Sequence, residues 1–193
     1  MDREKIKERL EKMVSPQKYI HSLNVMHTAK SLCEALHEDS DRAEIAGLLH
    51  DCAKDLPDES ILNLCEKYDI EVDDICRVQP KLLHGPLGAA LAEDIFKIRD
   101  EAILCAISCH TMGKENMSLL DKIVFITDYI EPDRNFPGVN QIRKIVYTDI
   151  NKAMIISLER TIKHIMVKGG LIHPNTIRAR NYLLLNTRVA AFC

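Results

Sequence analysis

Apolar residues recur every three or four positions along almost the whole chain, and this helical spacing is the feature that most restricts its fold. Between residues 16 and 36 the spacing places Tyr19, Leu23, Met26 and Cys33 on one helix face. We find no convincing run of alternating polar and apolar residues, which a half-buried strand would need, and no internal repeat. The pattern therefore predicts an all-α fold, a helical bundle of about eight to ten helices.

Capping residues, prolines and glycines mark where these helices begin and end. Pro132 stops the helix that runs through Ile130, and Glu131–Val139 is predicted to be a loop. Gly169-Gly170 predicts the C-terminal end of a long helix. The predicted helix starts are Ser15-Pro16, Asp39–Asp41, Pro57, Pro86, Asp100, Ser118 with Asp121 as a capping box, Thr148 and Asn175.

The chain has 193 residues, so we predict a single domain over residues 1–193, with a core from about residue 15 to about residue 185. A chain of this length can fold without disulfides or metal. The formal charge of -3 and the absence of Trp argue against a DNA- or RNA-binding surface. The longest apolar stretch, Ala102–Ile107, is too short to cross a membrane, and the N-terminus lacks the apolar segment of a signal peptide. We therefore expect a cytoplasmic protein.

The seven cysteines form an odd set without a C-x-x-C pair, and several lie on apolar helical faces. This usage predicts reduced, buried thiols, as is usual in the cytoplasm. Cys105 and Cys109 are four residues apart and share a helix face. Because no second Cys or His pair with zinc-finger spacing completes a site, we assign both thiols to the core.

The histidines and aspartates are the residues that indicate a functional site in this sequence. His50 and Asp51 are adjacent, and neighbouring helical side chains point about 100° apart, so both reach one ion only near a helix end. His21 lies on the preceding helix, with enough chain between for the two helices to meet. Asp128 lies on an apolar helix, where burial is costly unless a metal ion or a salt bridge pairs with the carboxylate. Imidazole nitrogen with carboxylate oxygen suits Fe, Mn, Co or Zn.

His84 stands at a helix entrance and His110 ends a helix, so the chain order is His, His-Asp, two spaced His, then Asp. This order resembles the HD-domain phosphohydrolase superfamily. Four segments are similar to one branch of it, the YqeK family of bacterial symmetrical bis(5'-nucleosyl)-tetraphosphatases, and the resemblance runs from about Ser15 to Leu185. The segments are Tyr19–Val25, Ala46–Asp55, Leu82–Ala89 and Phe125–Val139, and the last contains the specific Glu-Pro-x-Arg-x-Phe-Pro-Gly motif.

The resemblance implies a metal site and catalytic residues. It assigns His21, His50, Asp51 and Asp128 to a first divalent ion, iron in this branch, with Mn, Co and Zn as alternatives. His84 and His110 match the positions that hold a second ion, which Asp51 would bridge. In a one-metal site the same two histidines would instead donate to phosphate oxygens. Asp51, His84 and His110 are thereby predicted to act in catalysis.

The resemblance also implies residues that bind substrate. Lys18 and Arg134 would lie near the polyphosphate, and Lys18 stands where HD proteins often carry Arg, which keeps the charge but loses the two-pronged phosphate contact. Lys54 and Asp55 either support the metal ligands or form a surface ion pair. A further segment resembles a stretch that closes over the nucleotide, although a helix end followed by a turn explains it equally. That segment is Gly169, Gly170, Leu171, Ile172, His173 and Pro174.

The implied activity is the hydrolysis of diadenosine tetraphosphate into two ADP, by attack of metal-bound hydroxide on a β-phosphorus. Two alternatives stay open at this point. One is an HD phosphohydrolase that acts on nucleoside or deoxynucleoside mono- or triphosphates. The other is a non-catalytic nucleotide sensor, against which the complete ligand set argues. A homodimer is compatible with a small helical protein.

Overall fold

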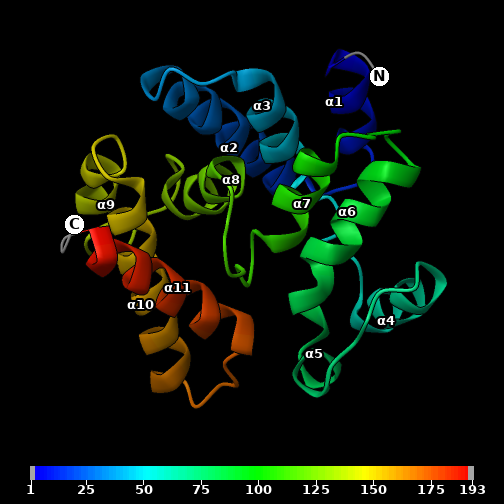
Figure 1. Ribbon diagram of the computed structural model, residues 1–193. Helices are drawn as coiled ribbons and strands as arrows, with labels where there is room; N and C mark the ends of the chain where they lie inside the picture. Colours follow the sequence, from blue (N-terminus) through cyan, green and yellow to red (C-terminus); the bar gives the residue numbers. More distant parts are fainter. Residues whose placement is uncertain (1–2, 191–193) are drawn as a thin grey trace.

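The computed structural model describes residues 3–190, and within that range the chain forms eleven α-helices and one short 3₁₀-helix without any strand (Figure 1). The all-α prediction is confirmed. The helices are α1 (Arg3–Glu11), α2 (Pro16–Ala35), α3 (Ser40–Leu49), α4 (Asp58–Lys67), α5 (Asp74–Val78), η1 (Pro80–Leu83), α6 (His84–Asp94), α7 (Glu101–Cys109), α8 (Leu119–Ile130), α9 (Val139–Ile145), α10 (Ile150–Val167) and α11 (Pro174–Ala190).

The number of helices exceeds the eight to ten predicted, because α1, α5 and α9 were not recognised in the sequence. Each of these helices has nine residues or fewer and buries only one or two side chains. Two or three apolar positions are too few to establish a helical period. Among residues 3–190, no helix combines the length and the apolar character needed to span a membrane.

Side-chain caps confirm several of the predicted helix starts. The Asp100 carboxylate accepts the backbone N–H of Ala102 at 3.0 Å, and Ser118 and Asp121 form the predicted capping box at the start of α8. Two predicted starts were wrong by about one turn or less. α6 begins at His84 rather than at Pro86, and α10 uses Asp149 as its N-cap. At the end of α10, Gly169 adopts a φ of +66°. The predicted glycine C-cap is therefore confirmed.

Four helices form the centre of the molecule. α2, α3, α7 and α8 pack against one another, and α6 packs along α7. Figure 1 shows α8 in the middle, with α2 and α3 above it and α10 and α11 below it. This arrangement brings the C-terminal ends of α3 and α7 toward α2 and α8, although these segments are far apart in the sequence.

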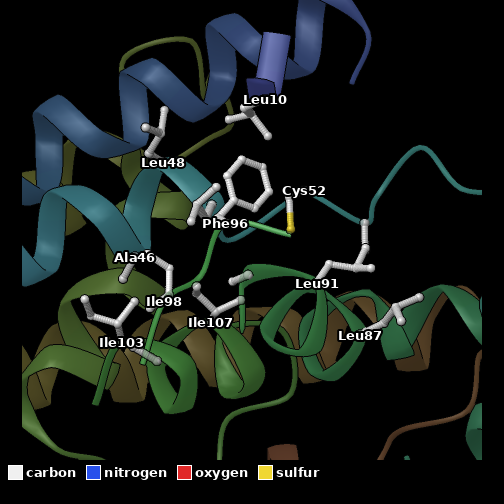
Figure 2. Packing of buried hydrophobic residues seen from close by; sticks show 14 of the residues in the cluster. Leu10, Ala46, Leu48, Cys52, Leu87, Leu91, Phe96, Ile98, Ile103 and Ile107 are labelled. Carbon is white, nitrogen blue, oxygen red and sulfur yellow. The ribbon is translucent and has the colours of Figure 1, made fainter. Parts of the chain in front are cut away.

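Two hydrophobic clusters hold these helices in place. The first surrounds the fully buried Phe96, and Figure 2 shows this ring with Leu10 and Cys52 around it. The second cluster joins α2 and α8 to α9, α10 and α11, with Ile126 and Leu158 among its fully buried members. Leu49, just before His50, and Ile107, three residues before His110, belong to the first cluster. Cys109 and the residues on both sides of Asp128 belong to the second. The predicted metal ligands therefore lie where the two clusters meet.

Candidate metal centre

The six side chains predicted to bind metal converge on one buried place. Five elements contribute them, and three of the histidines stand at helix ends: His50 and His110 are the C-cap residues of α3 and α7, and His84 is the first residue of α6. Burial is nearly complete for most of the group, since Asp51 is 3 % exposed and His50 is fully buried. The full set is His21 on α2, His50 and Asp51 after α3, His84 on α6, His110 after α7 and Asp128 on α8.

His21, His50 and Asp128 form the first half of the cluster. The Nε2 atoms of His21 and His50 are 3.2 Å apart, and His21 Nε2 lies 3.0 Å from Asp128 Oδ1. His50 Nε2 is 3.8 Å from the same carboxylate oxygen. Asp51 Oδ2 completes this half, at 3.8 Å from His21 Nε2 and 3.7 Å from His50 Nε2.

His84 and His110 form the second half, on the other oxygen of Asp51. Asp51 Oδ1 lies 3.1 Å from His84 Nε2 and 3.5 Å from His110 Nε2, and the two Nε2 atoms are 3.1 Å apart. Asp51 thus directs one oxygen to each pair of histidines. A carboxylate in this position is suited to bridge two ions, as the sequence predicted for Asp51.

Hydrogen bonds on the other ring nitrogen orient all four imidazoles. His50 Nδ1 donates to the Gly47 carbonyl and His110 Nδ1 donates to the Ile107 carbonyl, each at 2.7 Å. His84 Nδ1 donates in the same way to the carbonyl three residues earlier. His21 Nδ1 instead donates to a carboxylate oxygen at 3.2 Å. Since acceptors hold the proton on Nδ1, each Nε2 presents its lone pair to the cluster.

This donor set fits a metal ion. Among the described residues, His50 Nε2 faces only the His21 Nε2 lone pair and carboxylate oxygens, an arrangement that is repulsive unless a cation lies between them. Asp51 Oδ1, which is buried, has no hydrogen-bond donor. Neutral imidazoles with carboxylates are the ligands that Fe, Mn, Co and Zn accept. The cluster therefore suits a divalent metal.

The pKa shifts keep the ligands in the protonation states that metal binding requires. Burial lowers the pKa of His50 to about 4, and burial also lowers the pKa of His84. Burial by itself would raise the pKa of Asp51, but His50, the other two histidines beside it and Lys54 outweigh burial and hold this pKa well below its usual range. The pKa of Asp128 is lowered in the same way against burial, by its histidine neighbours and by a nearby arginine.

Three cations surround the cluster. Lys18 Nζ lies 3.3 Å from Asp51 Oδ2, and Lys54 Nζ lies 2.9 Å from His84 Nε2. The Arg134 guanidinium contacts both Asp128 Oδ1 and, at 2.9 Å from its Nε, the Asp128 carbonyl. The positive groups predicted near the polyphosphate therefore lie at the rim of the cluster, and Lys54 joins them.

Two residues of the site were missed from the sequence. Glu131 is buried and accepts the His21 Nδ1 proton, yet the sequence placed it only at the start of a loop. Thr111 Oγ1 lies 2.9 Å from His84 Nε2 and 3.1 Å from His110 Nε2. In the sequence, only the position of Thr111 directly after His110 indicated that Thr111 could belong to the site. For Asp55 the structure shows neither predicted role, because its carboxylate accepts the backbone N–H of Ser15 at 2.7 Å and ties down the start of α2.

None of the hydrogen bonds described for the segment from Gly169 to Pro174 reaches a predicted metal ligand. Its first residues are exposed and form the end of α10. His173 is buried and uses both ring nitrogens locally: Nε2 donates to Asp73 at 2.7 Å, and Nδ1 accepts the N–H of Asn175 at 3.2 Å. The polar contacts described for this segment thus tie α11 to the start of α5.

Two surface pockets are lined by residues next to Glu131 or His84 in the sequence, and the lining of neither includes one of the six predicted ligands. One, of about 500 Å³, is bounded by Ile130 and Pro132, which flank Glu131. The other, of about 420 Å³, is bounded by Leu83 and Pro86, which flank His84. The remaining residues of the first pocket are Asn24, His27, Thr28, Ser31, Arg143 and Tyr147, and those of the second are Glu71, Asp73, Cys76, Met112, His173, Pro174, Asn175 and Arg178.

The sequence was compared with known families and proteins. Residues 19–133 match the HD domain family, and this match includes all six convergent ligands. The chain is 38% identical to the symmetrical bis(5'-nucleosyl)-tetraphosphatase of Bacillus subtilis (strain 168), which covers 95% of this chain and 98% of the relative. It is 34% identical to the Staphylococcus aureus (strain NCTC 8325 / PS 47) protein of the same name, with 94% of each chain covered.

The structure was compared with solved structures. A predicted HD superfamily hydrolase from Clostridium acetobutylicum, described as involved in NAD metabolism, superimposes with a TM-score of 0.94. The two sequences are 46% identical, and the match covers 96% of this chain and 98% of the other. The likeness extends beyond residues 19–133 and therefore includes α10 and most of α11.

Proposed function

This chain belongs to the HD domain family, and we propose that it is a symmetrical bis(5'-nucleosyl)-tetraphosphatase that cleaves diadenosine tetraphosphate into two ADP. The observation that carries this proposal is the convergence of four imidazole Nε2 atoms and two carboxylates, in a chain that aligns over nearly its whole length with tetraphosphatases. It is therefore an enzyme, a metal-dependent hydrolase of a phosphoanhydride bond.

The proposed first metal site comprises His21, His50, Asp51 and Asp128, and we infer iron as its resident ion. A metal ion bound there lowers the pKa of a water molecule and stabilises charge on the phosphoryl oxygens. The chain contributes the orientation of the ligands. Glu131 and three backbone carbonyls fix the imidazole rings, and the lowered pKa values of His50, Asp51 and Asp128 keep their ligand atoms free of protons. Such supporting contacts are usually worth tenfold or more in metal affinity.

The half of the cluster on the Oδ1 side of Asp51 has a role separate from the first metal site. It contains His84, His110 and Thr111. Lys54 and the Thr111 hydroxyl both supply donors to His84 Nε2, so this half of the cluster is stable without a second cation. We infer that these residues hold a second ion or, when the histidines take up a proton at Nε2, donate to a phosphoryl oxygen of the substrate. Either role stabilises negative charge as the phosphoanhydride bond breaks.

Lys18, Lys54 and Arg134 are proposed to bind the polyphosphate chain. The substrate carries several negative charges at neutral pH. The three cations balance the carboxylates of Asp51, Asp128 and Glu131, so a divalent ion bound among the ligands would leave a net positive potential for the substrate. Arg134 presents a planar fork that suits phosphate oxygens, whereas the two lysines act as point charges. A positioned cation of this kind contributes roughly 3 kcal/mol to transition-state stabilisation.

The relatives named symmetrical bis(5'-nucleosyl)-tetraphosphatase support symmetrical cleavage. A substrate cut into two ADP would place the middle of its polyphosphate, the bond between the two β-phosphorus atoms, at the metal ligands. We propose that the pocket beside His173 and Pro174 binds one nucleoside end. Attack at a β-phosphorus expels ADP as the leaving group and leaves a second ADP.

Hydrolysis in oxygen-18 water, followed by mass spectrometry of the products, tests this assignment. We expect two ADP molecules, with one labelled oxygen on the terminal phosphate of one of them. AMP together with ATP would place the attack at the α-phosphorus and contradict the proposal. A clear preference for deoxynucleoside triphosphates would instead favour the other class of HD phosphohydrolase. The cytoplasmic location and the homodimer stay predictions.

A further inference from the structure

A second cluster of reactive side chains lies at the junction of α7 and α8, outside the metal centre. Cys105 and Cys109 are one turn apart on α7, Lys114 follows in the connecting segment, and Asp121 belongs to the first turn of α8. The two sulfur atoms and one Asp121 oxygen all lie within 4.8 Å of one another. The sequence assigned both thiols to the core, but the structure shows that only Cys109 is buried.

Lys114 is placed to stabilise a thiolate on Cys105. Its Nζ lies 2.9 Å from Cys105 Sγ and 3.2 Å from an Asp121 carboxylate oxygen. Asp121 is 1 % exposed, and its second oxygen has no hydrogen-bond partner, so this buried carboxylate anchors the lysine beside the sulfur. An ammonium group in contact with a cysteine favours the anionic form of that cysteine.

The pKa of Cys105 is shifted in the opposite direction from that of the buried cysteines. A hydrogen bond from Cys109 and then the contact with Lys114 lower the pKa of Cys105 to about 6, against the opposing effects of burial and of Asp121. In contrast, burial raises the pKa of Cys33 to about 11 and of Cys52 to about 12. Of the six cysteines in the described part of the chain, Cys105 is also the one that is not buried.

We propose that Cys105 is a redox-sensitive thiolate, which hydroperoxides oxidise and which Cys109 then captures as a reversible disulfide. In the first step the thiolate sulfur attacks the terminal oxygen of the hydroperoxide. The O–O bond breaks, a sulfenic acid forms, and the alkoxide or hydroxide that leaves takes a proton from water. In the second step the Cys109 sulfur attacks the Cys105 sulfur, and the hydroxyl leaves with the thiol proton as water. Two thiols are oxidised, and one peroxide is reduced.

This disulfide would act on the metal centre through the end of α7. Side chains four apart on a regular helix have Cβ atoms about 5–6 Å apart. A disulfide needs the Cβ atoms of its two cysteines to be about 3.5–4.5 Å apart. Bond formation therefore has to distort the last turn of α7, which ends at Cys109. His110 is the next residue, and its orienting bond to the Ile107 carbonyl belongs to that same turn. We expect oxidation to displace His110 and to slow turnover, an effect on activity that rests on the proposed function.

Peptide mapping by mass spectrometry tests the thiol chemistry without any activity assay. The metal-loaded protein is treated with hydrogen peroxide at pH 7, and we expect a Cys105–Cys109 disulfide that dithiothreitol reverses. Lys114→Met should form it roughly fivefold more slowly, because the thiolate fraction falls while its intrinsic nucleophilicity rises. Lys122→Met, which removes a neighbouring lysine on α8, is the control and should keep the wild-type rate.

The Cys109→Ala variant should stop at a sulfenic acid on Cys105, which dimedone traps. Absence of the disulfide in the wild type, or equal rates in the two lysine variants, overturns the proposal.

Activity assays on the same samples test whether the disulfide slows turnover at the metal centre. Cys105→Ser should keep the basal rate and lose the dithiothreitol-reversible part of the inhibition by peroxide. An equal reversible loss in Cys105→Ser would place the sensitive group elsewhere, and unchanged turnover in fully disulfide-bonded wild type would show that the bond does not regulate the site. If the reduced wild type does not hydrolyse diadenosine tetraphosphate, the proposed function fails, while the peptide map still decides whether Cys105 and Cys109 form the redox pair.

Discussion

At the scale of single residues, Asp51 holds the centre together because each of its two oxygens faces a different pair of histidines. Asp55, one turn further along, is chemically identical, but among the described residues its carboxylate accepts only the Ser15 N–H. The same side chain thus has two different environments within five residues of the chain. The effect of an aspartate on metal binding therefore depends on its position in the fold and not on the residue type.

The contrast between these two aspartates makes the first prediction. Asp51→Asn keeps the shape of the side chain but removes the charge that pairs with a cation, so we expect loss of metal and a decrease in turnover of at least about a hundredfold. Asp55→Asn should keep both, because an amide oxygen can still accept the Ser15 N–H. Metal analysis and steady-state kinetics measure the difference, and circular dichroism should show the same helix content in both variants. Retained turnover in Asp51→Asn would contradict its role as a ligand.

The division of the cluster into two halves makes the second prediction. His50→Ala removes a nitrogen that faces only another lone pair and carboxylates, so it should abolish binding of the first ion. His84→Ala removes a nitrogen that Lys54 and Thr111 already contact, so it should slow catalysis while at least one equivalent of metal remains bound. Inductively coupled plasma mass spectrometry gives the ratio of metal to protein. Complete loss of metal in both variants would mean that the two halves form a single site.

At the scale of helices, the site depends on how closely α6 approaches α7. His84 begins α6, and the next residue, Gly85, lies against the backbone of α7. A Cβ atom on Gly85 would lie 2.6 Å from the Ser108 carbonyl oxygen, which is shorter than any ordinary contact. This close approach brings His84 Nε2 to 3.1 Å from His110 Nε2. A glycine at this position is therefore required by the geometry of the metal centre.

Substitution of this glycine makes the third prediction. Gly85→Ala should push α6 away from α7, lower the free energy of unfolding by about 1–3 kcal/mol and separate His84 from His110. Gly88→Ala on the same helix is a matched control, because its Cβ would meet the His50 carbonyl at an ordinary 3.4 Å. Urea unfolding measures the stability, and kcat of the metal-loaded protein measures the effect on the site. Equal effects of the two substitutions would argue that the approach of α6 to α7 does not position His84.

At the scale of the whole molecule, the two hydrophobic clusters stabilise the fold, and the polar ligands between them reduce its stability unless they are neutral or paired. His50 is fully buried at this boundary. The protonated form of a buried imidazole is disfavoured, so the folded protein holds His50 in its neutral form. The stability of the metal-free protein is therefore linked to pH.

This linkage makes the fourth prediction. The pKa of His50 is about 4 in the folded protein, against 6.5 for an ordinary histidine, so between these values the unfolded chain binds more protons than the folded one. The free energy of unfolding of the metal-free protein should then fall as the pH is lowered through this window, by about 2 kcal/mol between pH 7 and pH 5 from His50 alone. This contribution should be almost completely restored by about pH 7.5, where the unfolded chain has also lost the proton.

Urea unfolding of chelator-treated protein at the two pH values measures this change, and His50→Gln is the control. The variant has no imidazole at position 50, so its loss of stability between pH 7 and pH 5 should be smaller by the same amount. Bound metal should steepen the dependence in the wild type, because protons compete with the ion for the histidines. An identical change in wild type and variant would mean that His50 does not make this contribution.

Local sequence patterns predicted the helical fold, most helix ends and the identity of the side chains that converge. Helical periodicity and capping depend on residues three or four apart, so a single sequence displays them. The capping box of Ser118 and Asp121 and the glycine end of α10 were predicted for this reason. The ligands His21, His50 and Asp128 followed from the order of His and Asp motifs and their resemblance to HD phosphohydrolases.

Contacts between residues that are far apart in the chain became visible only in the folded molecule. Glu131 reaches His21 across 110 positions, and Cys105 meets Asp121 only after the chain has turned from α7 into α8. Asp55 was predicted near the site because it follows His50-Asp51, but packing turned it toward Ser15. Local patterns carry no information on such pairs, since their free energy depends on packing between helices that are remote in sequence. The candidate ligands could therefore be predicted from the chain, whereas the contacts that orient them could not.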